Sequence, residues 1–401
     1  MAKHPTSETT DSGHVNLREL VENKRTLIVV GSGGVGKTTT SAALGVQAAR
    51  LGRKVLVLTV DPAKRLATSL GLEELVNETS VVSPELFRKA GLDCGSGSLS
   101  AMMLDTKSTF DTLIRRYASD ETQRKIMKNP FYEQASTALA GSQEYMAMEK
   151  LYELRETSDF DLIILDTPPT SNALDFLTAP NRLEDFLGSN SIKVLSKSFR
   201  SASRVGLGFM RVNRWILKGL NRFIGTEPFL QLLEFIDSFQ EMYGGFKDRA
   251  NRVREIFRQD DVSFVIVSAT EVAAINEAFF FYDELKRFGM PFGSLLVNRV
   301  RMPRTSTLNP ELLPKQLRTA ISKLPVAERP ADTRIGAISE RVTEACINYR
   351  ILEKVDKREL QTIRARLSSD ARRLLAVPLF EHDIHHLEAL ASYGDSMFAV
   401  G

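Results

Sequence analysis

The chain has 401 residues, of which 43% are hydrophobic and 26% charged, a composition that is typical of a soluble globular protein. Its net charge of +3 is too small to indicate a nucleic-acid partner, and two distant cysteines, Cys94 and Cys346, suggest neither a disulfide framework nor a structural zinc site. The polar start lacks a signal-peptide core, and no run approaches the roughly 20 apolar residues of a membrane span. We therefore expect a cytoplasmic protein that binds no nucleic acid.

The first part of the chain alternates short apolar runs with a helical pattern. Residues 1–18 are polar, and we expect a flexible tail. Thr26–Val30 is typical of a buried strand that enters a glycine-rich turn, residues 39–51 show helical spacing, and residues 54–60 indicate a second buried strand. Strand, helix and strand within about forty residues predict a right-handed parallel unit.

Further apolar runs predict the rest of one sheet, assembled from distant parts of the chain. These runs cover residues 99–104, 162–165, 262–267, 294–297 and 374–377. We expect an α/β fold with a doubly wound, mostly parallel sheet flanked by helices. Residues 183–258 are too long for a loop, so we expect them to form an inserted α-helical subdomain. The expected segments are the tail (1–18), the sheet domain (19–106, 157–182, 259–300 and 371–401), two helical segments (107–156 and 301–370) and the helical insertion (183–258).

The glycines after the first strand fit two phosphate-binding motifs. Gly31–Gly36 satisfies the GxGxxG pattern of dinucleotide-binding proteins, and Gly31–Thr38 satisfies the GxxxxGK[ST] pattern of the P-loop. Only a P-loop needs the Lys-Thr pair, because Lys37 reaches the outer phosphates and the Thr38 hydroxyl binds Mg²⁺. Asp61 lies about 25 residues past the last glycine, whereas the dinucleotide motif has its acidic residue about 20 residues past that glycine. The spacing therefore fits the dinucleotide motif less well. The sequence therefore predicts a P-loop NTPase that binds ATP and Mg²⁺. The predicted nucleotide-binding residues of the loop are Gly33, Gly34, Val35, Gly36, Lys37, Thr38 and Thr39.

Two aspartates follow later strands at the same edge of the sheet. Asp61 precedes Pro62 and Ala63, and it is interpreted either as a catalytic residue that orients the attacking water or as a helix N-cap. Asp166 precedes Thr167 and Pro168, and we expect it to serve Mg²⁺ through a bound water; a capping residue in a turn is the alternative.

With the P-loop, the Asp61 motif and the Asp166 motif in this order, the chain resembles the family of the arsenite-pump ATPase and of the eukaryotic ATPase that targets tail-anchored membrane proteins. The resemblance is carried by residues 31–39, Asp61-Pro62-Ala63 with Leu66 and Leu70, residues 100–105, residues 166–174 with Pro180, Glu271, Asn298 and residues 377–379. It implies catalytic roles for Asp61 and Lys37, magnesium binding by Thr38 and Asp166, and adenine contacts from Asn298 and Pro378. It also implies a dimer that opens and closes with ATP hydrolysis, and a helical lobe that handles hydrophobic cargo.

The chain departs from that family pattern in three ways. Ser32 stands where the family loop carries a lysine that reaches the partner's nucleotide, so we expect either slow hydrolysis or a heterodimer with a lysine-bearing paralogous ATPase. The zinc-binding cysteine pair of the eukaryotic branch is absent, so the resemblance is to a bacterial-type member. Lys64 and Arg65 stand after Asp61-Pro62-Ala63, where members of that family usually have His and Asn. The alternative to an ATPase is a poorly hydrolysing nucleotide-binding scaffold, or the regulatory half of a heterodimer.

Residues 186–226 contain basic and apolar side chains and no acidic ones. Such a segment suits an anionic membrane surface, with the protein peripherally attached, or a hydrophobic helix as cargo. An ordinary helix with a solvated basic face is the alternative that the sequence leaves open. His382, His385 and His386 have no cysteine companions, so we expect no metal site there.

Overall fold

The computed structural model describes residues 17–60, 64–73, 75, 77–132, 142–168, 251–303, 313–325 and 332–399, with single positions between 231 and 249. The strands are β1 (Thr26–Val30), β2 (Lys54–Thr59), β3 (Ser80–Val81), β4 (Ser98–Met103), β5 (Leu162–Asp166), β6 (Val262–Ala269), β7 (Phe292–Val300) and β8 (Leu374–Pro378). The helices are α1 (Leu17–Asn23), α2 (Lys37–Arg50), α3 (Lys64–Ser69), α4 (Pro84–Lys89), α5 (Thr106–Tyr117), α6 (Asp120–Lys128), α8 (Ser142–Thr157), α14 (Val272–Phe288), α15 (Leu313–Ser322), α16 (Asp332–Leu367) and α17 (Leu387–Ala399).

All eight of these strands form one sheet, in the order β3-β4-β2-β5-β1-β6-β7-β8. Every neighbouring pair is parallel except β3 and β4. The central strands β1, β5 and β6 are buried along their whole length, as expected for parallel strands that are covered on both faces. The predicted doubly wound, mostly parallel α/β sheet is therefore confirmed.

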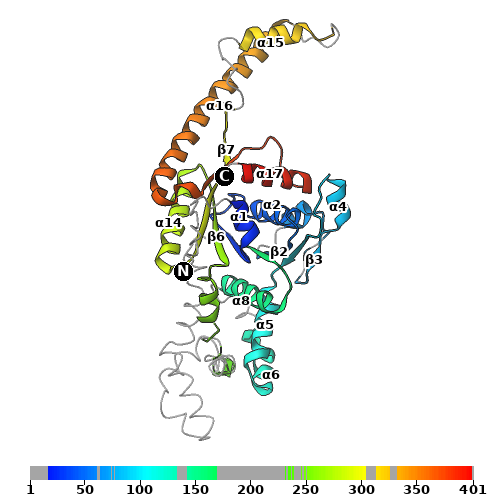
Figure 1. Cartoon of the computed structure of the whole chain (residues 1–401), viewed down its shortest axis with the longest axis vertical. Coiled ribbons are helices and arrows are strands. Elements are labelled where there is room, and N and C mark those ends of the chain that lie inside the picture. Colours follow the sequence, from blue (N-terminus) through cyan, green and yellow to red (C-terminus); the bar gives the residue numbers. More distant parts are fainter. Residues whose placement is uncertain are drawn as a thin grey trace, which may run out of the picture.

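Two hydrophobic cores lie on the two faces of the sheet. Side chains alternate between the faces along a strand, so Leu27 of β1 belongs to one core and Ile28 to the other. The core that contains Leu27 packs against α1, α2 and α17, and the core that contains Ile28 packs against α5, α8 and α14. Figure 1 shows α2 and α17 running side by side, and their packing fixes the first turn of α2 against the C-terminal helix.

Several element boundaries differ from the sequence-based expectation. Helix α1 begins at Leu17, whose side chain is fully buried, so the last two residues of the expected tail, Leu17 and Arg18, belong to a helix. The edge strand β3 has two residues and was not predicted, because so short a pairing leaves no periodicity in the sequence. The expected helical segment 107–156 contains three helices, and residues 133–141 within it lie outside the described residues. Most of the expected insertion 183–258, including all of the basic segment 186–226, lies outside them too.

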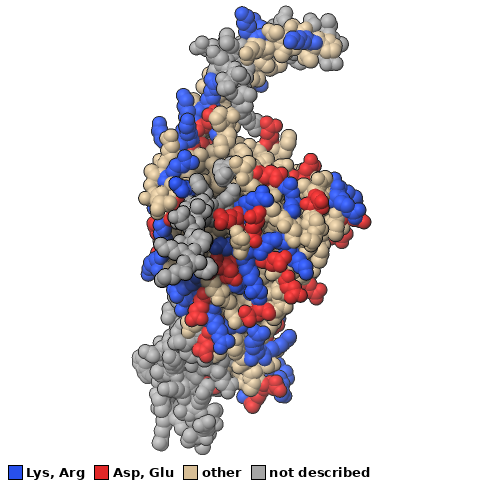
Figure 2. All heavy atoms as spheres, in the orientation of Figure 1, with Lys and Arg blue, Asp and Glu red and all other residues tan. Residues whose placement is uncertain are grey.

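No helix within the described ranges has both the length and the apolar composition that crossing a membrane requires. On the face seen in Figure 2, basic and acidic side chains are interspersed over the described surface, in line with the small net charge of +3.

Candidate functional site

The loop between β1 and α2 is held close to the ends of two neighbouring strands. Gly31 has a φ of +151°, and a Cβ there would lie 2.1 Å from the carbonyl oxygen of Val267 in β6. Gly36 has a φ of +100°, and a Cβ there would lie 2.4 Å from Nδ2 of Asn298 in β7. Only glycine fits these two positions, because other residues rarely adopt such a φ and have no room for their side chains.

Lys37 starts helix α2 at the end of this loop. Its side chain is only 6% exposed, and its Nζ donates a hydrogen bond to the carbonyl oxygen of Ser32 at 2.9 Å. Helix α2 begins without a side-chain cap, so its first N–H groups are not engaged by an N-cap side chain. A helix N-terminus that meets a glycine loop and a lysine is a ready-made phosphate site.

Asp166 ends β5 and is completely buried next to the start of α2. Its Oδ2 accepts hydrogen bonds from the hydroxyls of Thr38 at 2.8 Å and Thr59 at 3.0 Å. Burial raises the pKa of Asp166 to about 6, while these hydrogen bonds and the charge of Lys37 act in the opposite direction. A buried carboxylate joined to a threonine hydroxyl is a set of hard oxygen donors, and it therefore fits a magnesium ion.

Asn298 links the end of β7 to the phosphate loop. The side chain is 5% exposed, its Nδ2 donates to the carbonyl oxygen of Val35 at 2.9 Å, and its Oδ1 accepts from the N–H of Arg299 at 2.9 Å. Arg299 has a φ of +58°, which is uncommon for a residue other than glycine, and the bond to Asn298 helps to hold it there. Asn298 thus supports the loop, in addition to lining the cavity where we expect its adenine contact.

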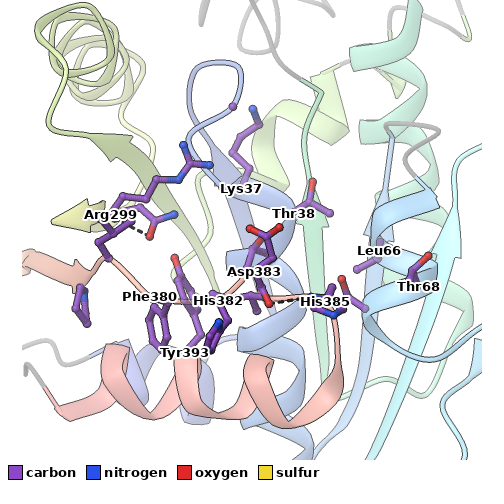
Figure 3. A pocket seen from close by; sticks show the side chains of 18 of the residues that line it. Lys37, Thr38, Leu66, Thr68, Arg299, Phe380, His382, Asp383, His385 and Tyr393 are labelled. Carbon is purple, nitrogen blue, oxygen red and sulfur yellow. Dashed lines mark hydrogen bonds between the residues drawn. The ribbon is translucent and has the colours of Figure 1, made fainter. Parts of the chain in front are cut away.

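A cavity of about 690 Å³ opens beside the loop, which is within the size range of small-molecule sites. Residues from five parts of the chain line it (Figure 3). They include Gly34, Gly36, Lys37, Thr38 and Thr39 of the loop and α2, Leu66, Thr68 and Ser69 of α3, Thr167 after β5, Asn298 and Arg299 of β7, and Pro378, Leu379, Phe380, His382, Asp383, Ile384, His385 and Tyr393 of the C-terminal region. The structure therefore brings Lys37 and Thr38 of the P-loop motif to the same cavity as Asn298 and Pro378, the two residues to which the family resemblance assigns adenine contacts.

The aromatic side of this cavity was not predicted from the sequence. The rings of Phe380 and Tyr393 are 5.6 Å apart, and the hydroxyl of Tyr393 lies 3.1 Å from that of Thr40 in the first turn of α2. Phe380 follows Pro378 closely, which was an available signal, whereas Tyr393 lies within a helix that has no motif.

The remaining predicted features are Asp61, the loop beyond Pro168 and the histidines just before α17. Asp61 and the loop beyond Pro168 lie outside the described residues, so the structure does not position them. The Nδ1 atom of His386 accepts from the N–H of Ala389 in the first turn of α17, and Nδ1 of His385 lies 2.8 Å from the carbonyl oxygen of Asp383.

We expect Gly36→Ala to abolish nucleotide binding, because the added Cβ would displace Asn298 and the loop, and to destabilise the fold by about 1–2 kcal/mol or more. Gly91→Ala is a matched control, since Gly91 also has a positive φ of +68° but has no heavy atom within 4 Å of its Cβ position. Calorimetric ATP binding and chemical denaturation of both variants test this. Equal ATP affinity in the two variants would show that the contact between Gly36 and Asn298 does not shape the site.

Comparison with known proteins yields one family match and distant relatives. The family described as "Anion-transporting ATPase" matches residues 24–320. The chain is 25% identical over 300 residues to "ATPase GET3" of Malassezia globosa, covering 74% of this chain and 80% of that protein. It is 26% identical over 301 residues to "ATPase GET3" of Pyricularia oryzae, covering 73% and 79%. The family match includes the loop, Asp166 and Asn298, whereas β8 and α17 lie beyond it.

Proposed function

Because this chain belongs to the anion-transporting ATPase family, we propose that it binds ATP with magnesium at the loop Gly31–Thr38 and hydrolyses the nucleotide. The observation that carries the proposal is the hydrogen bond between the buried Asp166 and Thr38 next to Lys37, at the start of a helix entered through two glycines that tolerate no side chain. A simple strand–helix turn needs neither a buried carboxylate nor a buried lysine. Burying either charged group destabilises the fold unless a ligand or a partner compensates the charge.

We propose that different residues of the site bind the phosphates and the magnesium ion. The loop N–H groups and Lys37 bind phosphate oxygens, and Thr38 and Asp166 hold the magnesium, Asp166 through a bound water. When bound, magnesium supplies positive charge that neutralises the outer phosphate oxygens. We propose that Asn298 and Pro378 lie against adenine. The nearby rings of Phe380 and Tyr393 support this assignment, because they make that side of the cavity suitable for a base.

Asp61 is proposed to orient the attacking water. In the sequence it follows strand β2 and precedes helix α3, and α3 contributes Leu66, Thr68 and Ser69 to the cavity lining. These neighbours support a place for Asp61 near the phosphates. Positioning a water in this way accounts for much of the catalysis in phosphoryl transfer, because such reactions depend mainly on orientation and charge.

We further propose that the protein works as a dimer whose shape changes with the nucleotide, with hydrophobic or membrane-protein cargo handled by the region that includes residues 186–226. This part of the proposal rests on the family resemblance and on the basic, apolar composition of that segment. A lysine-bearing paralogue as the second subunit is the alternative to a homodimer, because Ser32 leaves this chain without the family's lysine in the loop.

The rate of ATP hydrolysis by the Ser32→Lys variant distinguishes the proposed ATPase from the nucleotide-binding scaffold. We expect the purified wild-type chain to turn over ATP slowly and Ser32→Lys to raise kcat by about tenfold or more, because a cation would then be available to the transition state. Ser32→Gln is the control for side-chain length. Tight ATP binding with no turnover in the wild type or the lysine variant would instead support the nucleotide-binding scaffold.

A further inference from the structure

Helix α16 is 36 residues long and leaves the sheet to form, with α15, an arm that projects from the body (Figure 1). One side of the helix is fixed to the end of β7. Asp356 is 2% exposed and accepts from the N–H of Arg301 at 2.8 Å, and the hydroxyl of Tyr349 donates to the carbonyl oxygen of Met302 at 3.1 Å. The orientation of this part of α16 is therefore set by the body.

The opposite side of the same stretch carries three exposed β-branched residues. Ile347 is 44% exposed, Ile351 56% and Val355 46%. They are four residues apart, and since each residue turns a helix by about 100°, their side chains lie within an arc of about 80°. Single exposed apolar residues are ordinary, but three on successive turns form a continuous apolar strip that water solvates poorly.

Opposite charges flank this strip at equal distances. Glu344 lies three residues before Ile347 and Arg358 three residues after Val355, and both are exposed. Within the described part of the chain, neither has an ion-pair partner. The spacing 344–347–351–355–358 is therefore symmetric about Ile351, with an acid at one end and a base at the other.

That symmetry matches an antiparallel copy of the same helix. With a two-fold axis at Ile351, Ile347 of one copy faces Val355 of the other, and Glu344 faces Arg358 twice. A self-complementary patch of this kind is what a two-fold interface between identical subunits requires. A parallel pair would instead place Glu344 against Glu344.

We propose that Glu344, Ile347, Ile351, Val355 and Arg358, the α16 stripe, join two copies of this chain through antiparallel α16 helices. The stripe spans about 21 Å, so the interface is small and the dimer is expected to be weak, in the micromolar range. The contact lies on the arm and not in the nucleotide cavity, so it persists in nucleotide-free protein.

Sedimentation velocity of the nucleotide-free full chain, over concentrations up to several hundred micromolar, tests the pairing. We expect Glu344→Arg to raise the dimer Kd by about tenfold or more, because like charges would then meet twice, and the double variant Glu344→Arg/Arg358→Glu to restore the wild-type Kd. Lys357→Glu is the matched control, since this exposed cation points about 120° away from Ile351 around the helix. A monomer at every concentration, or a double variant as weak as the single one, would overturn the proposal.

Disulfide formation tests the register separately. In a Cys94→Ser/Cys346→Ser background, Ile351→Cys is expected to cross-link to itself, whereas Glu344→Cys is expected to cross-link to Arg358→Cys and not to itself. Self-linkage of Glu344→Cys would show a parallel pair and overturn the antiparallel one. Binding of an apolar helical peptide or of anionic vesicles to the stripe, without self-association, would identify another occupant and refute the proposal. None of these readouts requires nucleotide, so failure of the proposed ATPase leaves this test intact.

Discussion

Replacing Lys37 by methionine is expected to reduce ATP hydrolysis by a factor of about 10³ or more. Lys37 is nearly buried at the start of α2 and reaches back to the carbonyl oxygen of Ser32, so its ammonium group is held within the phosphate loop. Methionine keeps the length and most of the packing while removing the charge. The loss should therefore appear in nucleotide binding and turnover, with little change in the free energy of unfolding.

Lys54→Met is the matched control for Lys37→Met. Lys54 is exposed at the amino end of β2, and parallel strands place that end away from the phosphate loop. Phosphate release at saturating ATP should be unchanged in this variant. Wild-type turnover in Lys37→Met would mean that the phosphates are bound elsewhere.

Asp166→Asn is expected to have opposite effects on activity and on stability. Hydrolysis should fall by about 10²–10³-fold and lose its dependence on magnesium, because a neutral amide attracts the hydrated cation far less than a carboxylate does. Without nucleotide, the variant should be at least as stable as the wild type. Burial penalises the charge of Asp166, and an amide oxygen can still accept from the hydroxyls of Thr38 and Thr59.

Magnesium titrations of activity and urea denaturation measure these two effects. Asp161→Asn serves as the control, since Asp161 is an exposed acid just before the same strand at its opposite end. A large loss of stability in Asp166→Asn would indicate that the carboxylate is chiefly structural. Unchanged magnesium dependence would remove Asp166 from the metal site.

The sheet could be predicted from the sequence because parallel strands covered on both faces are almost wholly apolar. Thr26–Val30 was predicted with its observed bounds, and the other long strands were found within a few residues. The phosphate loop was equally clear, since the roles of Gly31, Gly36 and Lys37 depend on local backbone geometry and on spacing along the chain.

Features that depend on contacts between distant segments could not be predicted in the same way. The bond from Asn298 to Val35 joins residues 263 positions apart, and the contact of Tyr393 with Thr40 joins residues 353 apart. The outward orientation of the apolar strip on α16 also depends on contacts between segments that are distant in the sequence. Ile347, Ile351 and Val355 would be core residues in a typical amphipathic helix, and only the packing of Asp356 and Tyr349 on the body shows that they face outward.

Calorimetric titration of ATP into the purified chain, with magnesium and again with excess EDTA, tests the central claim most directly. We predict one ATP bound per chain, an affinity at least about tenfold weaker in EDTA, and no measurable binding to Lys37→Met. Absence of binding to the wild type, or equal binding to wild type and Lys37→Met, would contradict the assignment of the Gly31–Thr38 loop as the nucleotide site.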